Sequence, residues 1–263
     1  MRFLHDVVRW FGDTQHWHGS NGIPQRMWEH VQLSAFAVGV AAVVALPVGI
    51  LFGHLRRGGF AAVTVANIGR AIPSFAILAL ALPLSIRLGL GLGFWPTFVA
   101  LFLLAIPPMV INAYTGVRGV DRAVIEAARG MGMRPAQLLL RVELPLASPV
   151  VLAGVRVAAV QVVATATLGA LVAWGGLGRY IVDGFQQRDT VKMFAGAVLV
   201  AALAIVTEVA FGLLDHVVLP RGLRRRGLAQ YVKAWGAWGE STKPTPLTAQ
   251  IGRGASASRA APQ

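Results

Sequence analysis

The sequence predicts an all-α polytopic membrane protein with about five transmembrane helices. Hydrophobic residues make up 56% of the 263-residue chain, and its mean hydropathy is +0.63, values typical of membrane proteins. Uncharged apolar runs recur, and several reach the roughly 20 residues that a helix needs to cross a bilayer. The charged residues lie between and after these runs, so the net charge of +13 indicates membrane topology rather than a nucleic-acid-binding surface.

Residues 1–30 are expected to form an external amphipathic segment. Its apolar and aromatic residues suit one helical face at a membrane interface: Leu4, Val7, Val8, Phe11, Trp10, Trp17 and Trp28. No apolar stretch there ends in a small-residue cleavage site, so we expect no cleaved signal peptide. His16 and His18 alone are weak evidence for a metal site, and the chain has no cysteine. We therefore expect no metal site and no disulfide.

Five apolar spans follow in the predicted membrane domain, residues 31–218. Their approximate bounds are 31–53, 60–84, 95–114, 146–173 and 193–218. In the first span, Pro47 and the motif Gly49-x-x-x-Gly53 predict a bend and a close contact with another helix. In the second span, Pro73 and Pro83 should kink or end the helix.

The distribution of Lys and Arg predicts the orientation of these spans. The side that holds loops 54–59 and 115–145 and the tail 219–263 carries 15 Lys and Arg, and the other side carries 7. By the positive-inside rule, loop 115–145 and the C-terminus lie in the cytoplasm and the N-terminus lies outside. The basic tail becomes polar and of low complexity, so we expect it to be disordered.

The loop of residues 115–145 is expected to form two short helices at the membrane surface. Asp121 can cap the first helix. Gly130 and Gly132 should end it before helix-favouring residues resume at Arg134. Such a loop, exposed and tied to membrane helices on both sides, can transmit the motion of a partner to the spans.

Three parts of this loop form a familiar pattern: Glu126-Ala127-Ala128, Gly132 and Leu144-Pro145. The pattern resembles the EAA loop of the membrane subunits of bacterial ABC importers, which docks on the ATPase subunit. Over residues 30–215 the chain also resembles the permeases of the osmoprotectant branch. Outside the loop, four segments carry this resemblance: Ala71–Ser74, Pro107–Gly116, Gly154–Arg156 and Gly175–Gly178.

The resemblance implies a type I ABC importer permease with a MetI-like fold in the inner or plasma membrane of a bacterium. The implied partners are two ATP-binding subunits, a second permease that is the same chain or a homologue, an external solute-binding protein and membrane lipid. The sequence has no phosphate-binding loop of the form Gly-x-x-x-x-Gly-Lys-Ser/Thr. We therefore expect a transport subunit that is no enzyme and binds no cofactor, with ATP and Mg on the partner ATPase. Nucleic acid is not an expected partner.

The implied solute is a small zwitterionic or quaternary ammonium osmoprotectant of the glycine betaine, carnitine, choline or proline type. An aromatic cage would recognise a quaternary ammonium group, but we expect the aromatic residues of the spans to be scattered, namely Phe36, Phe75, Phe98 and Phe102. Selection would then rest with the external binding protein. Two alternatives stay open: an amino-acid or methionine permease of the same class, and an ion-coupled secondary carrier that uses Arg70, Arg156 and Glu208.

A glycine-rich segment after the fourth span, Trp174–Gly178, lies on the predicted outer side. Its glycines Gly175, Gly176 and Gly178 suit either a possible gate that folds over the pore or a flexible connector. Three polar residues in or near this span suit either a polar path or hydrogen bonds between helices: Gln161, Thr165 and Thr167.

Charged residues inside the spans are expected to pair. Arg156 follows Pro145 by 11 residues and Glu208 precedes Pro220 by 12, which places both about 16–18 Å from the cytoplasmic ends of their spans. Unpaired charges in a bilayer cost at least a few kcal/mol, so an ion pair between Arg156 and Glu208 is one possibility. Arg70, at a similar depth, competes for the same carboxylate. The alternative is that each charge reaches water separately.

Overall fold

The computed structural model describes residues 2–56, 63–64, 67, 69 and 72–218 of the chain. Within these residues all regular structure is helical and no strand occurs, so the predicted all-α class is confirmed. The predicted tail 219–263 lies outside the described residues, and so does Arg70, which was predicted to compete for the carboxylate of Glu208.

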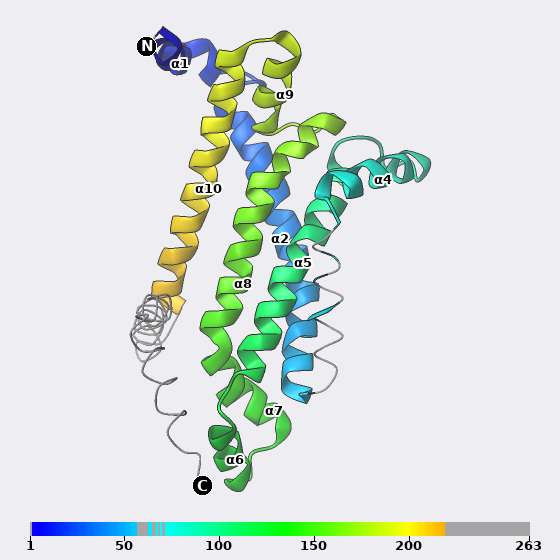
Figure 1. Ribbon diagram of the computed structural model, residues 1–263, viewed down its shortest axis with the longest axis vertical. Coiled ribbons are helices and arrows are strands. Elements are labelled where there is room, and N and C mark those ends of the chain that lie inside the picture. Colours follow the sequence, from blue (N-terminus) through cyan, green and yellow to red (C-terminus); the bar gives the residue numbers. More distant parts are fainter. Residues whose placement is uncertain (1, 57–62, 65–66, 68, 70–71, 219–263) are drawn as a thin grey trace, which may run out of the picture. The chain divides into compact units, whose positions relative to one another are not determined.

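The helices follow one another along the chain, with long helices separated by short ones (Figure 1). Their bounds are α1 (Arg2–Gly12), α2 (Ile23–Leu55), α4 (Ser74–Arg87), α5 (Phe94–Arg118), α6 (Arg122–Gly130), α7 (Pro135–Leu138), α8 (Leu144–Thr165), α9 (Gly178–Gln187) and α10 (Thr190–Val218). Three segments have other helical geometries: the 3₁₀-helices η1 (Thr14–Trp17) and η3 (Ala166–Val172), and the π-helix η2 (Leu139–Glu143).

Four stretches among the described residues are long and apolar enough to cross a membrane: Ile23–Leu55, Phe94–Arg118, Pro135–Val172 and Thr190–Asp215. They correspond to the first, third, fourth and fifth predicted spans. The first begins at Ile23 rather than residue 31, because Pro24 stands in the first turn of α2, where its missing N–H needs no partner. This helix therefore extends beyond its apolar run and carries polar residues at its start.

The second predicted span is not one helix. The described part of residues 60–84 is interrupted by a bend at Ile72 and by Pro73, and α4 begins only at Ser74. A residue before proline is disfavoured in the helical region, which accounts for the break at Ile72. Pro83, in contrast, does not end α4, which continues to Arg87.

Helices α2, α5 and α8 form the centre of the molecule (Figure 1). Small residues spaced four apart line the buried face of α2: Ala37, Ala41, Ala45, Gly49 and Gly53. A Cβ on Gly49 would lie 2.7 Å from the Cβ of Ala113 on α5, and a Cβ on Gly154 of α8 would lie 2.6 Å from that of Asn112. The predicted close contact at Gly49 and Gly53 is therefore confirmed, because only glycine lets these backbones approach so closely.

The short helices lie at opposite ends of this bundle (Figure 1). Helices α6 and α7 lie at the end where α5 finishes and α8 starts, whereas α1, α4 and α9 lie at the other end. Helix α10 packs on α8 and α9, and α1 packs on α10. Near the N-terminus α1 buries Val7 and leaves Leu4 and Val8 exposed; the external, amphipathic character of residues 1–30 stays a prediction.

Candidate functional site

The loop between α5 and α8 folds into two short helices, as its sequence predicts. The side chain of Asp121 caps α6 by accepting a hydrogen bond of 2.9 Å from the backbone N–H of Ala123. Gly132 adopts a φ of +80°, the left-handed conformation that reverses the chain. The backbone N–H of Arg134 then donates to Gln137 Oε1 at 3.0 Å, which fixes the start of α7.

The Glu126-Ala127-Ala128 motif divides between two faces of α6. Ala128 is buried with Ile125 and Leu138 in a small core of the loop itself. Glu126 and Ala127 are exposed, as is Met131, whose side chain is 72% exposed. The motif therefore stabilises the loop from inside and presents a mixed polar and apolar surface outside.

Leu144 and Pro145 stand where the loop becomes a membrane helix. Helix α7, the π-helix η2 and α8 follow without a break, so the second half of the loop is a direct extension of the span. The backbone N–H of Leu144 bonds to the carbonyl of Leu139, five residues earlier, which is the wide spacing of a π-helix. Pro145 is the second residue of α8; because the helix already runs through η2, its missing N–H removes one hydrogen bond to the preceding turn.

The predicted gate glycines pack closely against other elements. The backbone N–H of Gly176 donates to Glu29 Oε2 at 2.8 Å, and Arg26 holds the same oxygen at 2.9 Å. Gly176 has a φ of +77°. A Cβ on Gly175 would overlap the Glu29 carboxylate, and a Cβ on Gly178 would overlap the backbone of Thr167. The segment is thus fastened to the start of α2 by close packing and a hydrogen bond.

The residues that bind the gate segment, or that hold the elements on either side of it, were not among the predicted site residues. Besides Glu29, His30 is buried and its Nε2 lies 2.8 Å from the carbonyl oxygen of Val163. Tyr180 on α9 donates its hydroxyl to the carbonyl of Asn21 at 2.7 Å, and burial raises the pKa of the Tyr180 phenol. The polar residues at the start of a long apolar helix could have indicated a site there. Their hydrogen-bond partners, however, lie more than 130 residues later in the sequence.

The structure brings Arg156 and Glu208 together. The guanidinium of Arg156 on α8 contacts the carboxylate of Glu208 on α10. Its other nitrogen, Nη1, lies 3.5 Å from Asp215 Oδ2, a partner that sequence reasoning missed. Glu208 and Asp215 are seven residues apart on one face of α10, and Gly212 lies between them beside the guanidinium.

The expectation that the aromatic residues of the spans are scattered is wrong. Phe36 on α2 lies 5.1 Å from Phe98 on α5, ring centre to centre, and Phe94 lies 5.2 Å from Trp174. Phe102 stacks on Phe98 at 5.8 Å. The rings of α2, α5 and Trp174 therefore form one cluster of stacked and edge-on pairs. Of the four phenylalanines that were expected to be scattered, only Phe75 lies outside this cluster, exposed on α4.

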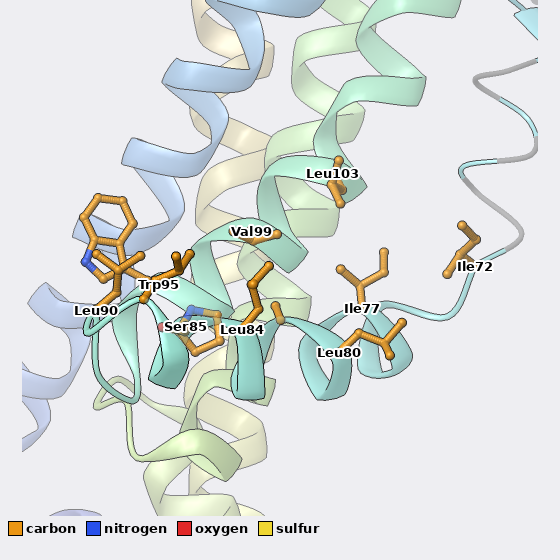
Figure 2. A pocket seen from close by; sticks show the side chains of 12 residues that line it. Ile72, Ile77, Leu80, Leu84, Ser85, Leu90, Trp95, Val99 and Leu103 are labelled. Atoms are coloured by element: carbon orange, nitrogen blue, oxygen red, sulfur yellow. The ribbon is translucent and has the colours of Figure 1, made fainter.

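An apolar groove of about 350 Å³ lies between α4 and α5. Figure 2 shows side chains of both helices along it, among them Ile77, Leu80, Leu84, Trp95, Val99 and Leu103. The hydroxyl of Ser85 donates to the carbonyl of Gly91 at 2.7 Å, which satisfies the one polar side chain of the lining. The lining is almost entirely apolar, so the groove suits an apolar group better than a polar solute.

The remaining predicted polar residues do not form a site together. Gln161, Thr165 and Thr167 are half-buried, and the hydroxyl of Thr167 donates to the carbonyl of Ala164 within its own chain segment. Over residues 2–56, 63–64, 67, 69 and 72–218, no group of three His, Asp or Glu is arranged to hold a metal ion.

Comparisons with known proteins identify the family. Residues 45–219 match the family model described as binding-protein-dependent transport system inner membrane component. The carnitine transport permease protein OpuCB of Listeria monocytogenes is 39% identical, over 83% of this chain and 95% of its own. The glycine betaine/carnitine/choline transport system permease protein OpuCB of Bacillus subtilis is 36% identical, over 74% of this chain and 88% of its own.

Solved structures of the MetNI methionine ABC transporter in inward-facing conformations are similar in fold. One of their chains matches with a TM-score of 0.66 and 25% identity, over 73% of this chain and 94% of that one. The helical architecture is therefore that of a type I importer permease, and it carries several apolar helices for a multi-pass membrane protein. The chain belongs to the family of binding-protein-dependent transport system inner membrane components.

Proposed function

We propose that this chain is the membrane-spanning permease subunit of an ATP-driven importer of small osmoprotectants. The solute is zwitterionic or a quaternary ammonium compound, of the glycine betaine, carnitine, choline or proline type. The observation that carries the proposal is the 39% identity to a carnitine permease over nearly all of that protein's length. The 36% identity to a permease named for glycine betaine, carnitine and choline supports the same solute class.

The ATPase docks on the exposed face of α6 in this proposal. Glu126 and Ala127 offer the contact surface, while the small core around Ala128 keeps α6 rigid. Two ATP-binding subunits serve a pair of permeases, either two copies of this chain or this chain with a homologue. ATP and Mg bind to those subunits, since this chain has no phosphate-binding loop.

The orientation follows from the positive charges. The coupling loop, residues 115–145, and the tail 219–263 lie in the cytoplasm, and α1 and α9 lie outside, as the 15 Lys and Arg on one side against 7 on the other favour. The solute-binding protein then delivers its cargo at the end of the bundle that carries α9. The loop with Gly175, Gly176 and Gly178 lies at this end and acts as the external gate, closed while Glu29 holds it.

Selection of the solute rests with the external binding protein. The aromatic rings of α2 and α5 pack on one another. The groove beside α4 is lined almost entirely by apolar side chains, which suit a zwitterion poorly. The permease accordingly passes what the binding protein delivers.

A second candidate within the same class is a permease for methionine or another amino acid. Its support is the likeness in fold to the MetNI transporter at a TM-score of 0.66. Its sequence identity of 25% is well below the 36–39% shared with the osmoprotectant permeases, and this difference favours the osmoprotectant.

Reconstitution into proteoliposomes with the cognate ATPase and binding protein tests the proposal. Labelled glycine betaine, carnitine and choline should enter only with ATP on the ATPase side, and unlabelled methionine should not compete. Methionine uptake in place of betaine would establish the second candidate. Uptake that follows an imposed ion gradient without ATP would overturn the proposal in favour of a secondary carrier.

A further inference from the structure

Glu143 carries a buried carboxylate where the coupling loop joins α8. It is the last residue of the π-helix η2, and its side chain is 2% exposed. Its Oε2 contacts Nδ1 of His54 on α2, 89 residues earlier in the chain. In the part of the chain that the structure describes, no other ion pair or side-chain hydrogen bond to this carboxylate occurs. A carboxylate so far from water depends on its partner, because an unpaired one would be strongly disfavoured.

The end of α2 is also fastened to the start of the coupling loop. Arg56, just after α2, donates from Nη2 to the carbonyl of Val120 at 3.1 Å. Arg118 at the end of α5 donates from Nη1 to the carbonyl of Arg56 at 3.2 Å. Gly53 lies so close to α5 that a Cβ there would be 3.0 Å from the carbonyl oxygen of Tyr114. The coupling loop is thus held to α2 at its beginning, near Val120, and at its end, at Glu143.

The opposite end of the same helix holds the gate segment. Glu29 accepts the hydrogen bond from the backbone N–H of Gly176 at 2.8 Å. Glu29 and His54 are 25 residues apart on one unbroken helix, a separation of about 38 Å at 1.5 Å per residue. One continuous helix, which contains Pro47, therefore contacts both the coupling loop, through His54, and the gate segment, through Glu29.

We propose that His54 and Glu143 are positioning residues that keep the coupling loop and α2 together, so that displacement of the loop moves α2 and through it the gate segment. The proposal rests on the proposed transport function. The packing at Gly53 and the backbone bonds of Arg56 hold the helix near the loop, and the His54–Glu143 contact fixes its register against η2. A contact between two side chains this deep transmits motion because neither can move without leaving the carboxylate unpaired.

The first test measures solute transported per ATP hydrolysed in proteoliposomes with the ATPase and binding protein. His54→Gln and Glu143→Gln should each lower this ratio by about 2- to 30-fold, the range of mutations within coupling networks. The double variant should lower it no further than the worse single variant. Exchange of the two residues, His54→Glu with Glu143→His, should restore part of the ratio. His5→Gln, on exposed α1, is the matched control and should leave the ratio unchanged.

Unchanged ratios in both single variants, or a double variant whose loss equals the product of the single losses, would overturn the proposal. Failure of the wild-type complex to transport any osmoprotectant would instead count against the proposed function. These two failures are distinguishable, because the ratio is read only from a complex whose wild type is active.

A second measurement remains informative if the glutamine variants do not assemble. The chain has no cysteine, so His54→Cys with Glu143→Cys gives one defined pair for a short thiol-reactive cross-linker. If the contact between positions 54 and 143 stays closed throughout the transport cycle, the double cysteine variant should lose uptake. Cross-linking the two cysteines should then restore it. Complete loss of uptake on cross-linking, reversed when the linker is cleaved, would show that the contact must open and would overturn the proposal.

Discussion

Arg156 on α8 and Glu208 on α10 are 52 residues apart in sequence and form an ion pair between the two helices. Asp215 approaches the same guanidinium at 3.5 Å, so one arginine serves two carboxylates. Helix α10 is largely exposed along its length, and this ion cluster is its polar attachment to α8. Removal of the arginine therefore leaves two acidic groups without their partner.

A double-mutant cycle measures what this pair contributes. Arg156→Ala and Glu208→Ala together should destabilise the protein less than the sum of the two single changes, by about 0.5–3 kcal/mol, the range for residues in direct contact. The stability of the wild type, the two single variants and the double variant is measured by thermal unfolding in detergent. Uptake is assayed in parallel. Asp215→Asn as a background removes the second carboxylate and should increase the measured coupling. Additive losses in both backgrounds would show that the contact contributes nothing.

Changes on the exposed coupling loop should affect docking of the ATPase but not insertion of the permease. Glu126→Lys reverses a charge on the exposed face of α6, so the fraction of ATPase that co-purifies should fall about tenfold or more if the contact involves this residue. Asp6→Lys, an exposed acidic residue of α1, is the matched control. Membrane abundance should stay near normal in both.

Gly132→Asp should impair docking through the backbone. Its φ of +80° costs a residue with a Cβ roughly 1–2 kcal/mol, and the reversal between α6 and α7 should loosen. Uptake should fall while the spans remain inserted, as protease protection of the membrane fraction would report. Undiminished ATPase binding and normal uptake in both loop variants would remove the loop from the coupling mechanism.

The gate segment should tolerate no side chain at Gly178. A Cβ there overlaps the backbone of Thr167, so Gly178→Ala should destabilise the protein by about 1–3 kcal/mol through overpacking. Gly39→Ala is the matched control, because nothing lies within 4 Å of a Cβ at that position of α2, and it should be neutral or stabilise by about 0.5–1 kcal/mol. An equal fall in the melting temperatures of the two variants would show that the close packing at Gly178 does not contribute to the free energy of unfolding.

Removal of residues 239–263 should leave assembly and uptake intact. This sequence contains no apolar periodicity with which to pack on a helix. Complexes truncated after Trp238 should contain the ATPase in normal proportion and transport at the wild-type rate. A loss of either would assign a binding role to the tail.

Much of the fold follows from local features of the sequence. Apolar run lengths gave four of the long helices, because the match of helix length to bilayer thickness depends on consecutive residues alone. Asp121 and Gly132 gave the bounds of α6, since a cap and a left-handed turn are properties of a few neighbouring residues. The break before α4 is also local, because it lies at Pro73, which was predicted to kink or end a helix.

Only the tertiary structure decided which distant side chains meet. The aromatic residues were visible in the sequence, yet whether Phe36 and Phe98 touch depends on the rotation of α2 about its axis against α5. The same holds for Asp215, which reaches Arg156 only because α10 packs on α8 with this face toward it.

The His54–Glu143 contact shows the limit most plainly. From the sequence alone, His54 and Glu143 are polar residues near helix ends, where each would ordinarily be solvated. Burial of Glu143 requires that α2, α5 and η2 converge at one point. That convergence depends on the close packing of α2 against α5 at Gly49 and Gly53. Helix formation depends on hydrogen bonds within four or five residues, whereas the partner of a buried charge depends on the summed packing of every helix around it.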